Sequence, residues 1–166
     1  MAIRINYLDA SAIVKLVVKE DRSQEMRDYV SYFGDSYLTT SLCFSEALGV
    51  LNLRYKKGDI GNEEYLRASE ELLALVRDSS IEIHDVGLAE RGIFDEVERM
   101  ILAHEKGRKK RLDLSDAFQL VTLRMVFPGL AQSCKLFITA DGYLAEAAKV
   151  EGLAVWNVMT DDPPKR

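Results

Sequence analysis

The chain has 166 residues, 48% of them hydrophobic and 30% charged, which is typical of one soluble globular domain with a substantial core. Its formal net charge of −5 disfavours a protein that coats nucleic acid nonspecifically, because such binding depends on neutralising phosphates. A nuclease whose cations are placed locally remains compatible with this charge.

Strand-like and helix-like segments alternate along the chain. The strand-like segments are continuous runs of apolar and β-branched residues, as in strands that are buried on both faces. In chain order we expect a strand at 3–8, helices at 10–19 and 23–33, a strand at 36–39, helices at 41–57 and 62–77, a strand at 81–86, helices at 88–106 and 115–127, a strand at 135–140, a helix at 142–150 and a strand at 153–158. This order predicts an α/β fold with a five-stranded parallel sheet flanked by helices.

The domain is expected to span residues 1–158, with a flexible tail at 159–166. No apolar run approaches the roughly 20 residues that span a bilayer, and residues 1–5 enter a strand pattern directly instead of forming a signal peptide. We therefore expect a cytoplasmic protein without membrane contact. Cys43 and Cys134 lie in apolar segments and are expected to be buried free thiols.

Asp9 closes the first predicted strand, and ligands of open α/β sheets bind beyond the carboxyl ends of strands. Asp9 also suits the N-cap of the next helix, and the two roles are compatible. Asp141 precedes Gly142, so a turn or cap is its simplest role. Ser11 and Thr139 offer hydroxyls that would position carboxylates or bound water.

Glu46 falls inside a helix whose residues three and four positions away are Leu42, Cys43, Gly49 and Val50. None of these can pair with a carboxylate, so Glu46 is expected to meet a cation or to line a cavity. Extension of the side chain from the edge of the core to solvent remains the alternative.

Asp116 opens the helix at 115–127, where an acidic residue complements the helix dipole. Asp113 or Ser115 is the expected cap. We favour Asp116 as the site residue, because it leads directly into the apolar pair Ala117 and Phe118, and assign capping to Asp113.

Four carboxylates at one edge of a sheet would repel one another, by about 4 kcal/mol for a pair about 4 Å apart at an effective dielectric near 20. Oxygen ligands without histidine or thiol select Mg²⁺ or Mn²⁺. Asp9, Glu46, Asp116 and Asp141 therefore indicate metal-assisted phosphoryl chemistry.

A basic segment at 106–111 holds five cations in six residues, immediately before Asp113. Arg108, Lys109, Lys110 and Arg111 are candidate RNA-binding residues. A solvated loop without function is the alternative.

The chain resembles the PIN domain family, and within it the VapC-type ribonuclease toxins, in four ordered motifs. They are YLDASA at 7–12, SEAL at 45–48, LSDA at 114–117 and TADGYL at 139–144. The resemblance implies a metal-dependent endoribonuclease in which Asp9 and Asp116 bind Mg²⁺ or Mn²⁺, while Glu46 and Asp141 complete the pocket directly or through water. It also implies a homodimer that is silenced by a small antitoxin protein. The chain is longer than the compact toxins, mainly around 88–106 and the basic segment.

Four alternatives differ in chemistry. A haloacid-type phosphohydrolase requires a second aspartate two positions after Asp9, where this chain has Ser11, and a receiver domain requires a lysine after the last strand. A serine or cysteine hydrolase is disfavoured, because His84 and His104 are the only histidines and neither has a catalytic or metal-binding motif. A catalytically inactive PIN-like module that binds RNA or protein stays open.

Overall fold

The computed structural model describes residues 4–31, 35–85, 92–105, 112–126 and 134–165. Within these ranges the chain forms five strands and seven helices. In chain order they are β1 (Arg4–Leu8), α1 (Ala10–Val17), α2 (Ser23–Val30), β2 (Asp35–Thr39), α3 (Ser41–Lys57), α4 (Asn62–Arg77), β3 (Glu82–Ile83), α5 (Ile93–Glu105), α6 (Leu114–Val126), β4 (Cys134–Thr139), α7 (Gly142–Val150) and β5 (Val155–Asn157).

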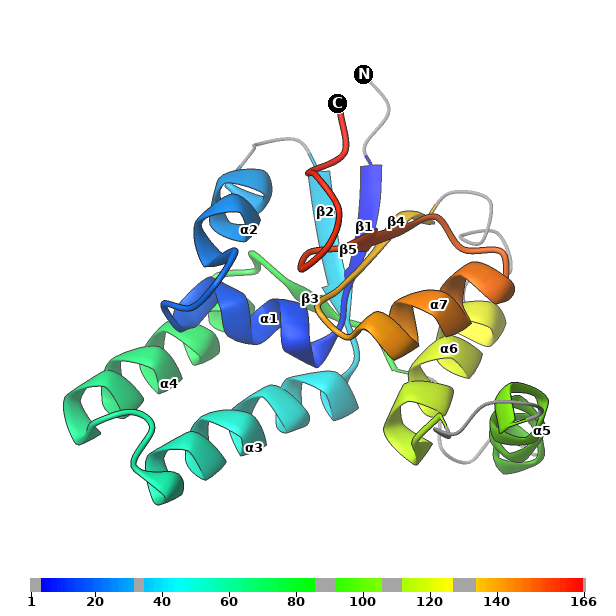
Figure 1. The fold of residues 1–166 in the computed structure, drawn as a ribbon, viewed down its shortest axis with the longest axis horizontal. Coiled ribbons are helices and arrows are strands. Elements are labelled where there is room, and N and C mark those ends of the chain that lie inside the picture. Colours follow the sequence, from blue (N-terminus) through cyan, green and yellow to red (C-terminus); the bar gives the residue numbers. More distant parts are fainter. Residues whose placement is uncertain (1–3, 32–34, 86–91, 106–111, 127–133, 166) are drawn as a thin grey trace.

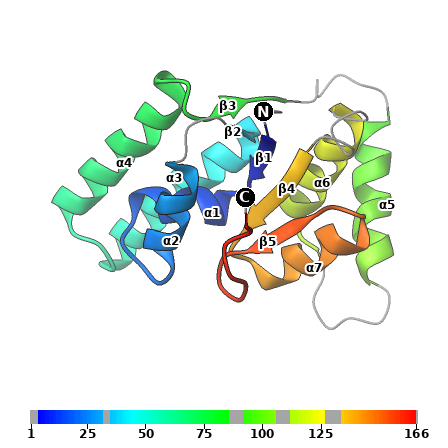
Figure 2. The ribbon, with the colours of Figure 1, turned by 90° about the horizontal axis from the view of Figure 1, so that it is seen from above.

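The five strands pair in parallel in the order β3-β2-β1-β4-β5, which confirms the predicted fold class. The chain runs outward from β1 to β3 and then crosses back to β4, so the strand order reverses between β1 and β4. Figures 1 and 2 show α1 to α4 on one side of the sheet and α5 to α7 on the other. Each side of the sheet is thus covered by its own group of helices, and the strand order reverses between the two groups.

Buried aromatic side chains pack at the centre of the sheet. Tyr7 of β1 lies opposite Phe137 of β4, and their rings stack with centroids 5.6 Å apart. On β5, Trp156 packs against Tyr29 of α2 with centroids 4.7 Å apart. Burial of one such side chain contributes about 1.5–3 kcal/mol. The residues that follow β1 and β4 are therefore attached to strands that are well packed in the core.

Polar residues at the ends of strands start three of the helices. Asp9 accepts a hydrogen bond from the backbone N–H of Ser11 at the start of α1, and Asp141 caps α7 in the same way. Thr40 caps α3. Because a capping side chain must fold back over the first helical turn, Asp9 and Asp141 are fixed at the carboxyl edge of the sheet.

The predicted boundaries of α3, α4 and α7 are confirmed, whereas the third strand is shorter than predicted. Among the described residues 81–85, only Glu82 and Ile83 form strand pairs with β2. Both are exposed, and β3 lies at the edge of the sheet. The expectation that this strand is buried on both faces was wrong. Parts of the predicted helix at 88–106 lie outside the described residues.

The remaining expectations concern the cysteines, the membrane and the tail. Cys43 is buried and free, as predicted, while the side chain of Cys134 lies outside the described part. No helix in the described ranges is long and apolar enough to cross a membrane. After β5, the backbone carbonyl of Asp161 accepts hydrogen bonds from the side chains of Arg22 and Trp156.

Candidate active site

A cavity of about 640 Å³ opens at the carboxyl edge of the sheet, beside the point where the strand order reverses. All four acidic residues singled out in the sequence line it. They come from four places: Asp9 follows β1, Glu46 lies on α3, Asp116 lies on α6 and Asp141 starts α7. The fold therefore brings together residues that are far apart in the chain, and we call this cavity the carboxylate pocket.

Asp9 is the most firmly held of the four acids. It is only 4% exposed, and its Oδ2 accepts hydrogen bonds from the hydroxyl of Thr139 at 2.9 Å and from the backbone N–H of Ser11 at 3.1 Å. The Ser11 hydroxyl donates to the same oxygen and accepts from the backbone N–H of Ala140 at 2.8 Å. Hydrogen bonds of this kind fix the orientation of a carboxylate.

Ser11 and Thr139 thus both contact Asp9, but they differ in position. Ser11 lines the carboxylate pocket, whereas Thr139 is fully buried behind it. The Thr139 hydroxyl also accepts from the backbone N–H of Asp141 at 3.0 Å. One threonine therefore contacts both the acid that follows β1 and the acid that follows β4.

Asp116 is positioned by the start of α6. Asp113 precedes the helix, and its Oδ1 accepts from the backbone N–H of Asp116 and from the hydroxyl of Ser115, both at 2.9 Å. Burial, followed by the charges of Asp113, Asp9, Asp141 and Glu46, raises the pKa of the Asp116 carboxyl to about 8. Without a cation, this carboxyl therefore retains a proton at neutral pH.

Glu46 is half-buried at the pocket wall. Burial is the main cause that raises the pKa of its carboxyl, the charges of Asp9 and Asp113 add to this effect, and a hydrogen bond from Ser115 opposes it. Of the two outcomes that the sequence left open, the structure shows a carboxylate that lines a cavity.

The donor chemistry of the carboxylate pocket fits a hard divalent cation. Asp9, Glu46, Asp116 and Asp141 offer only oxygen, and no histidine or cysteine is present among the described residues that line the cavity. Within the described ranges, no three His, Cys, Asp or Glu side chains are close enough together to form a preassembled metal site.

Two cations also line the carboxylate pocket, and the sequence analysis did not identify them. They are Lys15 of α1 and Arg54 of α3, which lie with Glu20 at one wall. A signal was present, since Lys15 interrupts the apolar run from Ile13 to Val17 much as Glu46 interrupts its own helix. The predicted RNA-binding residues Arg108, Lys109, Lys110 and Arg111 lie outside the described part of the chain.

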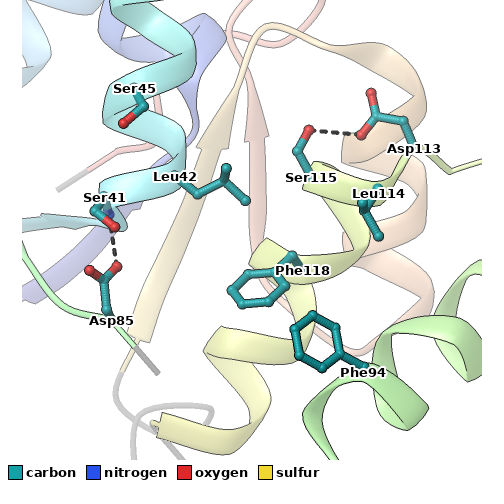
Figure 3. A pocket seen from close by; sticks show the side chains of 9 residues that line it. All are labelled: Ser41, Leu42, Ser45, Asp85, Phe94, Asp113, Leu114, Ser115 and Phe118. Atoms are coloured by element: carbon teal, nitrogen blue, oxygen red, sulfur yellow. Dashed lines mark hydrogen bonds between the residues drawn. The ribbon is translucent and has the colours of Figure 1, made fainter. Parts of the chain in front are cut away.

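An apolar pocket of about 620 Å³ adjoins the carboxylate pocket and shares Asp113 and Ser115 with it. Figure 3 shows Phe94 and Phe118 on its wall, from α5 and α6. On the opposite side, the backbone N–H of Ser41 donates to Asp85 at 2.8 Å. This pocket offers aromatic contact area next to the acids but lacks their grouped carboxylates.

No protein-family sequence model and no curated protein sequence matches the chain, but solved structures do. VapC20 of Mycobacterium tuberculosis, described as a sarcin-ricin loop cleaving toxin, superposes with a TM-score of 0.58 at 15% identity, over 86% of this chain and 94% of that one. The chain has a PIN-like fold.

Two further structures agree with this assignment of the fold. PAE2754 from Pyrobaculum aerophilum has a TM-score of 0.58 at 21% identity, over 93% of this chain and 90% of that one. FitAB, solved bound to an IR36 DNA fragment, has a TM-score of 0.58 at 16% identity, over 96% of this chain and 98% of that one. At these identities the likeness concerns the fold, so function has to be argued from the site.

Proposed function

We propose that the chain is a Mg²⁺- or Mn²⁺-dependent endoribonuclease and the toxin of a toxin–antitoxin pair. The observation that carries this proposal is that Asp9, Glu46, Asp116 and Asp141 line one pocket at the carboxyl edge of a PIN-like sheet. Ligands of open α/β sheets bind at such an edge, where the strand order reverses.

In this proposal Asp9 and Asp116 hold the cation, and Glu46 and Asp141 complete the pocket directly or through water. When bound, the ion would activate a water and stabilise charge that develops on the phosphodiester. Ser11 and Thr139 keep Asp9 oriented through their hydrogen bonds to its Oδ2. To ligate the ion, Asp116 would have to release the proton that it otherwise retains at neutral pH.

Several partners belong to the same proposal. The substrate is RNA, a small antitoxin protein covers the pocket, and the active form is a cytoplasmic homodimer whose nuclease unit comprises residues 1–158. Arg108, Lys109, Lys110 and Arg111 would contact the RNA backbone. The likeness to VapC20, a toxin that cleaves the sarcin-ricin loop, supports a toxin nuclease over other enzymes with an acidic site.

The haloacid alternative loses support at a specific position. Such an enzyme requires a second acid two positions after its nucleophile, and here Ser11 uses its hydroxyl to bind Asp9. A catalytically inactive PIN-like binding module would have the same fold, so only an assay of RNA cleavage distinguishes it from the nuclease.

The test is cleavage of structured and single-stranded RNA with Mg²⁺, with chelator, and with Mn²⁺ added back. We expect cleavage only with the cation, and a loss of at least about 100-fold in Asp9→Asn and Asp116→Asn. Glu98→Gln is the matched control, because this exposed acid of α5 lines neither pocket. Unchanged cleavage in both aspartate variants would exclude the site, and RNA binding without turnover would favour the inactive module.

A further inference from the structure

The carboxylate pocket has a cationic wall built from two helices and the turn after α1. Nζ of Lys15 lies 2.9 Å from Oε1 of Glu20 and donates to the backbone carbonyl of Asp21 at 2.7 Å. Nη2 of Arg54 lies 2.6 Å from the other carboxylate oxygen, Oε2 of Glu20. One carboxylate therefore bridges an ammonium from α1 and a guanidinium from α3.

The two cations differ in accessibility. The Lys15 side chain is only 4% exposed, whereas that of Arg54 is 30% exposed. Among the described residues, the Arg54 guanidinium has no hydrogen-bond acceptor besides Glu20. Because a guanidinium has five N–H donors, Arg54 keeps donors for a ligand while Glu20 holds it in place.

Glu20 is well suited to hold both cations. Burial by itself raises the pKa of its carboxyl, but the hydrogen bonds and charges of Lys15 and Arg54 outweigh burial and bring the pKa below its ordinary value. Glu20 therefore stays ionised at neutral pH. Lys15, buried beneath it, anchors the carboxylate and is itself poorly placed to reach a ligand.

The carboxylate pocket contains more acidic than basic side chains, so a guanidinium in its wall would favour the binding of an anionic ligand. Among the described lining residues there are six acids and two bases, namely Asp9, Glu20, Glu46, Asp113, Asp116 and Asp141 against Lys15 and Arg54. A polyanion entering this pocket meets repulsion that a bound cation offsets only in part. A fixed guanidinium on the wall matches the bidentate geometry of a phosphate.

We propose that Arg54 binds a phosphate of the RNA strand that occupies the carboxylate pocket, with Glu20 and Lys15 as positioning residues. This inference rests on the proposed function for its substrate class. If Arg54 served only to pair with Glu20, the ion pair would stabilise the fold, and the loss of Arg54 would not change the salt dependence of RNA binding.

The experiment compares wild type with Arg54→Gln and Arg54→Lys on one single-stranded RNA oligonucleotide at several KCl concentrations. In Mg²⁺, Arg54→Gln should raise KM about tenfold with little change in kcat. The slope of log(kcat/KM) against log salt should become shallower by about 0.7, the value for one lost contact to a single-strand phosphate. Arg54→Lys should keep most of the slope, because it keeps the charge.

Arg67→Gln is the matched control, since Arg67 pairs with Glu71 on the exposed face of α4 and does not line the pocket. This variant should leave KM and the slope unchanged. Thermal unfolding of each variant separates lost stability from lost binding. An unchanged KM and slope in folded Arg54→Gln would overturn the inference.

Fluorescence anisotropy with the same labelled oligonucleotide gives a readout that requires no cleavage. If wild type binds RNA without cutting it, the proposed nuclease fails, while a shallower salt slope in Arg54→Gln still supports the phosphate contact. If wild type cuts RNA in an Asp116-dependent way but Arg54→Gln behaves like wild type, only the inference fails. Absence of both binding and cleavage in wild type overturns both.

Discussion

Asp9 and Thr139 are joined by a hydrogen bond of 2.9 Å although 130 positions separate them in the chain. The bond links the residue after β1 to the last residue of β4, at the point where the strand order reverses. The Ser11 hydroxyl makes a second link, because it donates to Asp9 and accepts from the backbone of Ala140. Small hydroxyl side chains thus fix the geometry of the acid proposed as the leading metal ligand.

Ser11→Ala should lower RNA cleavage by about 10- to 100-fold, the usual effect of removing a group that orients a metal ligand. Asp9 would retain its bond from Thr139, so the residual activity should stay measurable. Initial rates at saturating Mg²⁺ provide the check. Ser11→Thr, which keeps the hydroxyl, should restore most of the activity, and Ser31→Ala, at an exposed hydroxyl of α2's carboxyl end, should have no effect. Wild-type rates in Ser11→Ala would refute the orienting role.

Mg²⁺ or Mn²⁺ should stabilise the protein independently of any RNA. A ligand present at 100 times its Kd adds about 2.7 kcal/mol, which raises Tm by about 5–10 °C for a chain of this size. Differential scanning fluorimetry with and without chelator measures this shift. Asp116→Asn should show a much smaller shift, and Glu98→Gln should match wild type. Equal shifts in all three proteins would place the cation elsewhere.

The metal-free protein should lose stability as pH rises. The pKa of Asp116 is raised to about 8 in the fold, above the ordinary 3.8, so the folded state binds the extra proton between these values. Because stability falls with pH wherever the folded state binds more protons, the contribution of Asp116 is present below about pH 4 and lost progressively up to about pH 8. Urea unfolding in chelator at pH 5 and pH 8 should show this decline, and Asp116→Asn should show less of it. Parallel pH profiles in the two proteins would contradict the prediction.

Glu20→Gln should destabilise the fold by about 3 kcal/mol, because it leaves the buried Lys15 ammonium without its carboxylate. The double variant Lys15→Met with Glu20→Gln should recover part of this loss, since the unpaired charge is then absent. Glu71→Gln, which breaks the exposed pair with Arg67, should cost less than about 1 kcal/mol. Denaturant midpoints for the four proteins distinguish these outcomes, and equal costs for the two single variants would contradict a buried role for Lys15.

Features set by neighbouring residues could be predicted from the sequence, whereas features set by distant contacts could not. The ends of α3 follow from Thr40 as the N-cap and Gly58, whose φ of 79° allows the left-handed conformation that ends the helix. The positions of Asp9 and Asp141 could be predicted because each follows a strand and caps a helix. The third strand shows the limit, since among its described residues, which have strand propensity, only Glu82 and Ile83 form strand pairs with β2.

The cationic wall depends on packing between helices, which no local signal specifies. Lys15 and Arg54 lie on α1 and α3, and only the packing of these helices brings both to Glu20. The hydrogen bond from Thr139 to Asp9 likewise requires β1 and β4 to be neighbours in the sheet. The sequence signal for this wall was Lys15 within an apolar helix. It indicates that the ammonium has a buried partner, but it does not identify Glu20 as that partner.

The pairing of β1 with β4 also determines when the pocket can exist during synthesis. Asp9 emerges from the ribosome early, but its partner Thr139 and the fourth acid, Asp141, follow more than 120 residues later. At a translation rate of about 5–20 residues per second, this interval is on the order of 10 seconds. Through that interval the nascent chain lacks the strand that completes its carboxylate pocket, so the pocket can form only after most of the chain has been made.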